Sequence, residues 1–363
     1  MTNRLFSPAQ AFREVLPGRH AAFLRTVVLF LVCLAAAAFS LSPARAYAQD
    51  NNILLIFSEQ TPSEIRMDLG EAFFDYLIDR GMIFDCEQIE LDSLHNQNLD
   101  SWTEKLGDKT EAIKAGKFRL IIAFGEPAAN TLKTIRSEIP QDTSIILSCM
   151  KSFSQDEWRG VHPNTTAVIR EINPRTNIEF GRKLFPGRNH VVLLASRYAW
   201  PGEQDKELKR EYAGKCTFST VYIGSDSQRD MNEAVEKIAA APDNSFIVSL
   251  DWDIYLPNAG SRTTMWRNLM GARPSDPLPV LVRRPADQLL RKYAIGGCMS
   301  PLQAVGEQTA KFAESILFGR EASGIKPVTV PETCTVYYDQ IRKWDYVKEA
   351  MPKDATWIDL PEP

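Results

Sequence analysis

Two short loops combine aromatic rings with charged groups, a pairing typical of sites that hold an organic ligand. Residues 196–200 read Ser-Arg-Tyr-Ala-Trp, and residues 251–255 read Asp-Trp-Asp-Ile-Tyr. Aromatic faces can stack on a ring or a sugar, while an arginine or an aspartate can orient the polar groups of the same molecule. The alternative is that each tryptophan packs against its own domain. We interpret both loops as ligand-binding and select Arg197, Tyr198, Trp200, Asp251 and Trp252.

Three junctions share a second pattern, in which an apolar run is followed by a polar turn and a helical pattern. The runs cover residues 53–57, 120–124 and 293–295, and a proline follows each at the expected first helical position. Helix N-termini at the carboxyl ends of parallel strands present free N–H groups and a positive dipole end. Open α/β sheets bind ligands at that edge. If all three junctions belong to one lobe, they would suit a carboxylate, a phosphate or a hydroxyl; otherwise they are simply well-capped helices.

The polar residues at these junctions are the second group of candidates. Thr61 and Ser300 are good N-cap residues, and Glu64 and Gln303 would complete a capping box with them. We expect a ligand to contact the residues that stand between strand and helix, namely Ser58, Thr61, Glu126 and Ser300.

The sequence lacks the usual signatures of catalysis and of cofactor binding. It contains no Gly-x-Ser-x-Gly elbow, no Gly-x-Gly-x-x-Gly fingerprint and no phosphate loop. Asp251 and Asp253 would point to opposite sides of an extended loop, so they are a poor catalytic pair. No histidines have metal-ligand spacing. We therefore predict no enzymatic activity, no cofactor and no metal.

The cysteines after the leader are widely spread, odd in number and form no Cys-x-x-Cys pair. This pattern argues against zinc and against a dense disulfide framework. We interpret them as buried thiols, with one disulfide left open: Cys86, Cys149, Cys216, Cys298 and Cys334.

Beyond residue 50, short apolar runs alternate with helical patterns, in two successive sets of about four units. This alternation predicts an α/β protein with two parallel sheets covered by helices on both faces. Residues 152–177 separate the sets, and their one extended run, 166–172, is expected to cross between lobes. The expected strands of the two sets are 53–57, 84–91, 120–124, 144–150, 191–195, 217–223, 246–250 and 279–282.

The start of the chain has the order of a secretory signal. A leader with four arginines precedes an uncharged, mainly apolar run at residues 26–41, and Ala46-Tyr47-Ala48 offers a cleavage site. The run is shorter than the roughly 20 residues that cross a bilayer. We predict a cleaved signal peptide at residues 1–48 and a periplasmic protein; an uncleaved N-terminal anchor and lipidation at Cys33 are the alternatives.

The charge balance excludes one class of partner. The chain has 42 basic and 46 acidic residues and a formal net charge of −4, without a long run of like charge. Nucleic-acid binding favours basic patches, so we predict no nucleic-acid partner.

Three stretches resemble the periplasmic substrate-binding component family of ABC transporters. Residues 120–129 read Leu-Ile-Ile-Ala-Phe-Gly-Glu-Pro-Ala-Ala, residues 167–192 contain Phe185-Pro186-Gly187, and residues 296–310 read Gly-Gly-Cys-Met-Ser-Pro-Leu-Gln-Ala-Val-Gly-Glu-Gln-Thr-Ala, followed by Ile-Leu-Phe-Gly at 316–319. Characterised relatives take up aromatic amino acids, and the same module serves some sensor histidine kinases as their input domain. The likeness covers most of residues 52–345.

The resemblance implies a type I periplasmic-binding-protein fold: two Rossmann-like lobes with parallel sheets, joined by three crossing strands. It assigns residues 49–165 and 291–325 to an N-terminal lobe, and 166–290 and 326–363 to a C-terminal lobe. Lys151 and Ser152 stand where the family often has Asp-Pro. The ligand loops carried over are 58–62, 125–128, 149–152, 196–200, 251–255 and 297–300, which add Lys151 and Ser152 to the candidates.

These observations predict a monomeric protein that captures a small-molecule ligand for uptake by an ABC permease. Closure of the lobes over an amino acid or an aromatic compound would be read by that permease. The alternative is a sensor whose closed form is presented to a membrane histidine kinase. In sensor relatives a membrane helix and a kinase follow this module directly, whereas this sequence ends at Pro363, so a sensory role is expected to need a separate partner chain.

Overall fold

A computed structural model describes most of the chain after the leader. The described residues are 51–59, 64–93, 96, 98–170, 173–196, 200, 202–223, 228–250, 259–282 and 290–358. The predicted signal peptide lies outside them, and Asn52–Pro363 forms a unit separate from Met1–Asn51. Within the described residues, no helix has both the length and the apolar character needed to cross a membrane.

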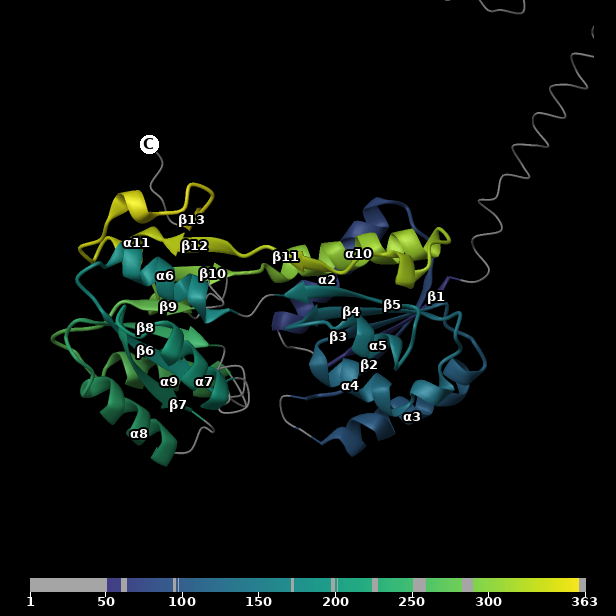
Figure 1. The fold of residues 1–363 in the computed structure, drawn as a ribbon, viewed down its shortest axis with the longest axis horizontal. Helices are drawn as coiled ribbons and strands as arrows, with labels where there is room; N and C mark the ends of the chain where they lie inside the picture. Colours follow the sequence, from purple (N-terminus) through teal and green to yellow (C-terminus); the bar gives the residue numbers. More distant parts are fainter. Residues whose placement is uncertain are drawn as a thin grey trace, which may run out of the picture. The chain divides into compact units, whose positions relative to one another are not determined.

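The first half of the described chain, together with the later strand β11, builds a six-stranded parallel sheet (Figure 1). Its spatial order is β11-β5-β4-β3-β1-β2. Residues of β1 alternate between two buried clusters, with Ile53 and Leu55 in one and Leu54 and Ile56 in the other. Such strands are apolar throughout because helices cover both faces. The strands are β1 (Asn52–Phe57), β2 (Asp85–Glu90), β3 (Leu120–Phe124), β4 (Ser144–Met150), β5 (Thr165–Arg170) and β11 (Val328–Val330).

Helices cover the two faces of this sheet in separate groups. Helices α2 (Glu64–Asp79) and α10 (Leu302–Leu317) contact each other and share one apolar cluster with the sheet. The opposite cluster receives α3 (Leu99–Lys114), α4 (Glu126–Thr134) and α5 (Gln155–Arg159). Two 3₁₀ turns, Arg136–Glu138 and Ala322–Gly324, complete this region.

A seven-stranded sheet follows the same plan, in the order β13-β12-β10-β9-β8-β6-β7. Helices α6 (Pro174–Leu184) and α7 (Gly202–Glu211) contribute to one cluster, and α8 (Gln228–Ala239) and α9 (Ala259–Met270) to the other. A short α11 (Tyr338–Ile341) follows β12. Only the β10–β12 pair is antiparallel among the pairings described. The strands are β6 (His190–Ala195), β7 (Thr217–Tyr222), β8 (Ser245–Leu250), β9 (Val280–Val282), β10 (Gly296–Met299), β12 (Thr333–Tyr337) and β13 (Thr356–Ile358).

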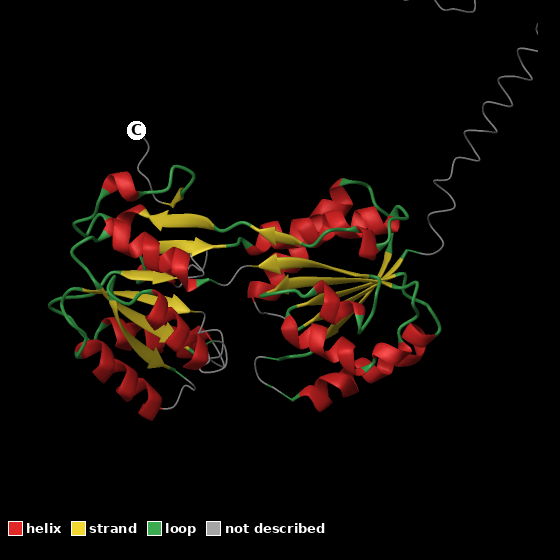
Figure 2. Cartoon of the chain, in the orientation of Figure 1, coloured by secondary structure: helices red, strands yellow, loops and turns green. Residues whose placement is uncertain are grey.

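The chain passes between the two sheets three times: after β5, after β10, and between β11 and β12. The predicted α/β class and type I architecture are confirmed in this topology. The predicted lobe boundaries remain a prediction; by strand pairing, the crossings come after Arg170, between Met299 and Leu302, and between Val330 and Thr333. Figure 2 shows the parallel strands of each sheet pointing toward these crossing segments, so both carboxyl edges lie on that side.

One predicted strand is wrong in position. The expected strand at 293–295 is instead β10 at Gly296–Met299, because two glycines that look like a turn in the sequence are the strand itself. A Cβ atom on Gly297 would lie 1.8 Å from the Val282 carbonyl oxygen, and one on Gly296 would lie 2.0 Å from that of Thr335. Only glycines allow β10 to fit between its two neighbouring strands.

A disulfide and a clamping asparagine hold β10 in place. Cys298 and Cys334 are bonded and are paired residues of β10 and β12. From α6, the side chain of Asn177 donates to the Cys298 carbonyl (2.7 Å) and accepts from the Cys298 N–H (2.8 Å). The disulfide that the sequence left open therefore joins the two strands that flank two of the three crossings.

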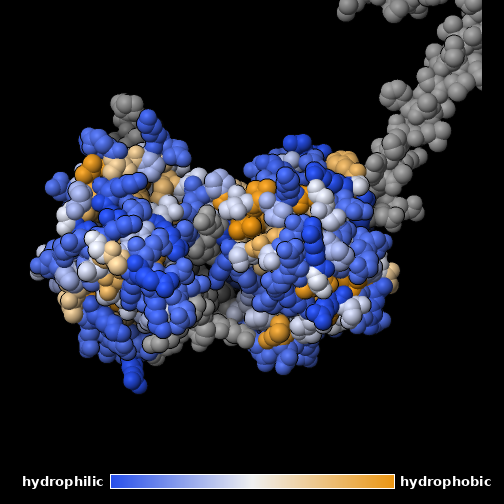
Figure 3. Space-filling view, in the orientation of Figure 1, coloured by the Kyte–Doolittle hydropathy of each residue, from blue (hydrophilic) through white to orange (hydrophobic). Residues whose placement is uncertain are grey.

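The face of the molecule drawn in Figure 3 shows little sign of a large apolar patch. Most of the face drawn in Figure 3 is hydrophilic, and apolar areas on it are small and separate. Scattered apolar exposure of this kind is ordinary for a folded protein. Among the described residues, the exposed large apolar side chains are Met67, Ile78, Ile83, Leu99, Phe318 and Val347.

We predict that replacing both Cys298 and Cys334 with alanine lowers the free energy of unfolding by about 2–4 kcal/mol, because the cross-link no longer restricts the unfolded chain. Urea denaturation monitored by circular dichroism measures the change. Alanine at the unbonded Cys86 is the control and should have a clearly smaller effect. Equal losses in both proteins would contradict a stabilising role for the disulfide.

Candidate functional site

The carboxyl edge of the six-stranded sheet brings together polar groups from several separate stretches of sequence. Parallel strands that end side by side place the residues that follow them at one edge, which is where open α/β sheets bind ligands. We call this set of residues the first-sheet edge; its members are Ser58, Glu59, Gly125, Glu126, Cys149, Lys151, Ser152, Arg170 and Ser300.

Ser58 binds the next junction of the sheet. Its buried hydroxyl donates to the Phe124 carbonyl (2.6 Å) and accepts from the Ala128 N–H (3.1 Å). Helix α4 has Gly125 as its N-cap, with φ of 91°, and a glycine supplies no capping side chain. Ser58 therefore satisfies an N–H group of the first turn of α4 from another strand. Its contact with a ligand remains a prediction.

Glu126 connects two neighbouring loops. Its Oε1 accepts a hydrogen bond of 2.7 Å from the backbone N–H of Lys151. Glu126 is half-buried, whereas the side chains of Lys151 and Ser152 are exposed. The structure thus brings these three candidates together at the edge, with two side chains accessible to solvent.

Cys149 has an unusual backbone at this edge. Its φ is 59°, a value that few non-glycine residues adopt, and the pairing of β4 with β5 shifts register between Ser148 and Met150. Burial raises the pKa of its thiol to about 11; the guanidinium of Arg170 opposes that rise, and the carboxylates of Glu126 and Glu59 add to it. These four charged or ionisable side chains therefore lie within electrostatic reach of one another.

Arg170 is a candidate that the sequence analysis missed. It ends β5, its relative exposure is 3%, and its Nε and Nη2 have no hydrogen-bond partner among the described residues. Native proteins leave few buried polar groups unsatisfied, and a buried charge without a partner is costly. The signal in the sequence was a single arginine that closes the run Thr-Thr-Ala-Val-Ile, which we interpreted only as a crossing strand.

Ser300 does not cap α10, contrary to the prediction. Its buried hydroxyl donates to the Val330 carbonyl (2.7 Å), which ties the crossing segment to β11. The helix begins at Leu302 with Pro301 as N-cap, so the predicted box with Gln303 is absent. No side chain caps α10, and its first turn holds no acidic residue. The positive end of this helix is therefore left at the first-sheet edge without a side-chain acceptor.

At the carboxyl edge of the seven-stranded sheet, the structure describes one of the predicted ligand residues. Trp200 is 7% exposed and packs in an apolar cluster of its own sheet, as the alternative interpretation held. Its backbone N–H donates to the Ser196 carbonyl, and its indole Nε1 has no partner among the described residues. Five predicted site residues lie outside the described residues: Thr61, Arg197, Tyr198, Asp251 and Trp252.

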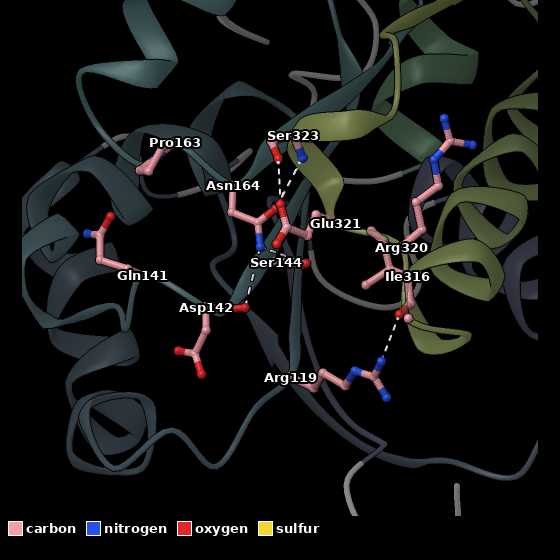
Figure 4. A pocket seen from close by; sticks show the side chains of 11 residues that line it. Arg119, Gln141, Asp142, Ser144, Pro163, Asn164, Ile316, Arg320, Glu321 and Ser323 are labelled. Carbon is pink, nitrogen blue, oxygen red and sulfur yellow. Dashed lines mark hydrogen bonds between the residues drawn. The ribbon is translucent and has the colours of Figure 1, made fainter. Parts of the chain in front are cut away.

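A hollow of about 290 Å³ opens at the opposite, amino edge of the six-stranded sheet (Figure 4). Its polar lining groups bind one another: Asn164 accepts from the Ser323 N–H and donates to Ser144, and Arg119 donates to the Ile316 carbonyl. None of the predicted site residues lines it. Among the described residues, no group of three or more His, Cys, Asp or Glu side chains could hold a metal ion.

Comparison with known proteins establishes the fold. No protein-family model matches the sequence, and neither does any curated protein. Among solved structures, a conserved domain protein from Vibrio cholerae is similar (TM-score 0.61, 14% identity, 85% of this chain and 99% of that one). A ligand-free, open substrate binding protein with adhesive properties from Clostridium difficile is also similar (TM-score 0.59, 12% identity, 85% of this chain and 99% of that one). The ABC domain in complex with L-Trp from Streptococcus pneumonia is similar as well (TM-score 0.55, 12% identity, 84% of this chain and 99% of that one). The chain has the type I periplasmic-binding-protein fold that the resemblance implied.

We predict that Ser58→Ala lowers the free energy of unfolding by about 1–2 kcal/mol, because α4 loses the acceptor of its Ala128 N–H and the Phe124 carbonyl loses a donor. Ser152→Ala at the same edge is the matched control and should change stability by less than about 0.5 kcal/mol, since its side chain is exposed. Urea denaturation compares the two. Equal effects would contradict the bridging role of Ser58.

Proposed function

We propose that this chain is an extracytoplasmic solute-binding protein of an ABC uptake system, and that it captures a small organic ligand between two hinged lobes. The observation that supports this most directly is the topology: two parallel sheets whose carboxyl edges both lie toward three short crossings. Three short segments between two well-packed sheets suit a hinge, and a ligand that contacts both edges would favour the closed form.

Two further observations are consistent with binding at these edges, and a third is consistent with export. Each edge holds a buried donor without a partner among the described residues, the guanidinium of Arg170 in one sheet and the indole N–H of Trp200 in the other. Cys149 has a backbone conformation that is often found near functional sites. The leader at residues 1–48 would export the protein, as such a binding protein requires.

The ligand class follows from the neighbours and the residues together. Proteins with this fold include one in complex with L-Trp, one with myo-inositol and one with D-arabinose. The aromatic and charged residues in the sequence of the loop 196–200 favour an amino acid or an aromatic compound over a sugar for this chain. The protein would act as a monomer, with an ABC permease as the membrane partner and without chemistry on its ligand.

Native mass spectrometry of the protein purified from its own cells tests this proposal. We expect a co-purified organic molecule, a chain that lacks residues 1–48, and compaction in X-ray scattering when the molecule is added back to stripped protein. The apparent Tm should rise with ligand concentration, because the ligand binds only the folded state. Chemical conversion of the molecule by the protein, or binding without compaction, would contradict solute capture.

Trp200→Phe tests the contribution of the second sheet. Phenylalanine keeps most of the buried apolar contact but removes the indole N–H, so we expect a Tm within a few degrees of wild type and about 5- to 10-fold weaker binding of the co-purified molecule in calorimetry. Trp266→Phe is a matched control on α9, because Trp266 is fully buried in a different cluster. Unchanged affinity in Trp200→Phe would remove this N–H from the site.

A further inference from the structure

We propose that the first-sheet edge binds the carboxylate of an organic acid, with the Arg170 guanidinium and the N-terminus of α10 as its receptor. The proposal rests on the proposed function and adds the chemical class of the ligand and a residue that selects it. A neutral solute would leave solute capture intact but would contradict this assignment.

The burial of Arg170 with two unsatisfied nitrogens is the first observation. The residue is 3% exposed, so its guanidinium loses hydration; it interacts with the Cys149 thiol, but its Nε and Nη2 gain no hydrogen bond from the described residues in return. An arrangement of this kind destabilises the free protein. A bound carboxylate would supply the missing acceptors, and the guanidinium fork matches its two oxygens.

The position of Arg170 next to the start of α10 is the second observation. Arg170 is paired in register with Val330, whose carbonyl accepts from Ser300, two residues before α10 begins. Val168 lies on the same side of β5 as Arg170 and belongs to the cluster that contains Leu302 and Val305 of α10. The side chain of Arg170 thus projects on the face that α10 covers.

The electrostatics of this end of α10 also favour an anion. The helix has 16 residues, no capping side chain and no acid in its first turn. Its positive end and the guanidinium of Arg170 are two like charges that repel each other, and an anion bound between them would relieve that repulsion. Two independent features of the fold therefore point to the same kind of ligand group.

The surrounding carboxylates limit the charge of that group. Glu126, whose carboxylate accepts from the Lys151 N–H, and Glu59, which directly follows Ser58 at the end of β1, stand at the same edge of the sheet as Arg170. A dianion such as phosphate would be repelled by these carboxylates, whereas a singly charged carboxylate needs only one strong cationic partner. We therefore assign the site to a monocarboxylate.

The test compares acids with their primary amides, which have nearly the same shape and lack the negative charge. The probes are L-tryptophan, lactate and benzoate, each paired with its amide, together with inorganic phosphate and D-arabinose; thermal shift and calorimetry report binding. We expect at least one acid to raise the Tm of the stripped wild-type protein and to bind about 10- to 100-fold more tightly than its amide.

Variants separate recognition from structure. Arg170→Gln should weaken binding of the responding acid about 10- to 100-fold, whereas Arg119→Gln, an arginine at the other edge of the same sheet, should keep wild-type affinity. Arg170→Met, which replaces a buried guanidinium with two unsatisfied nitrogens by an apolar side chain, should have an acid-free Tm equal to or above that of wild type. Arg170→Lys should keep part of the preference for the acid.

Distinct results would overturn the assignment. An amide that binds as tightly as its acid, or a response to D-arabinose alone, rejects the carboxylate but leaves solute capture standing. A response to phosphate alone rejects the monocarboxylate in favour of another oxyanion. An Arg170→Met protein that melts well below wild type would make Arg170 a structural residue. Absence of any bound small molecule, in the panel or in native mass spectra, would reject both proposals.

Discussion

The fit of β10 between β9 and β12 is the constraint on which the two-sheet arrangement depends. This strand belongs to the seven-stranded sheet, yet the helix that follows it covers the six-stranded one. Glycines at 296 and 297 allow the close approach, and the bond from Cys298 to Cys334 joins the strand to its antiparallel neighbour. If β10 moved, two crossings and the start of α10 would move with it. The proposed hinge and the proposed binding edge therefore depend on the same four-residue strand.

Strands that are apolar on both faces could be located from the sequence with accuracy. The predicted runs at 120–124 and 144–150 coincide with β3 and β4, because a buried parallel strand has a continuous apolar signature that local sequence carries. The strand at 296–299 was missed because its composition is that of a turn, and only the approach of Val282 and Thr335, distant in sequence, makes glycine necessary there. Short edge strands such as β11 and β13 carry too few residues for a periodic pattern.

The candidate site shows a similar division. Sequence reasoning placed Ser58, Glu126, Lys151 and Ser152 at one edge of one sheet, and the strands that they follow do lie side by side. It could not assign their contacts, because a hydroxyl such as that of Ser300 can cap its own helix or bond a distant carbonyl with equal ease. Sequence reasoning could not identify Arg170 for another reason. Whether an arginine is buried with unsatisfied nitrogens depends on the packing of α10 and β11 around it, and no local sequence pattern predicts that packing.

Helix α10 gives the clearest physical contrast between the two edges of the six-stranded sheet. At its C-terminal end, Arg119 donates to the Ile316 carbonyl, and a cation at that end of a helix is favourable. At its N-terminal end the nearby cation is Arg170, and there the dipole makes a cation unfavourable. At the amino edge, Asn164, Ser144 and Ser323 bind one another. At the carboxyl edge, two nitrogens of Arg170 have no partner among the described residues, and the proposed carboxylate would supply their acceptors from outside the chain.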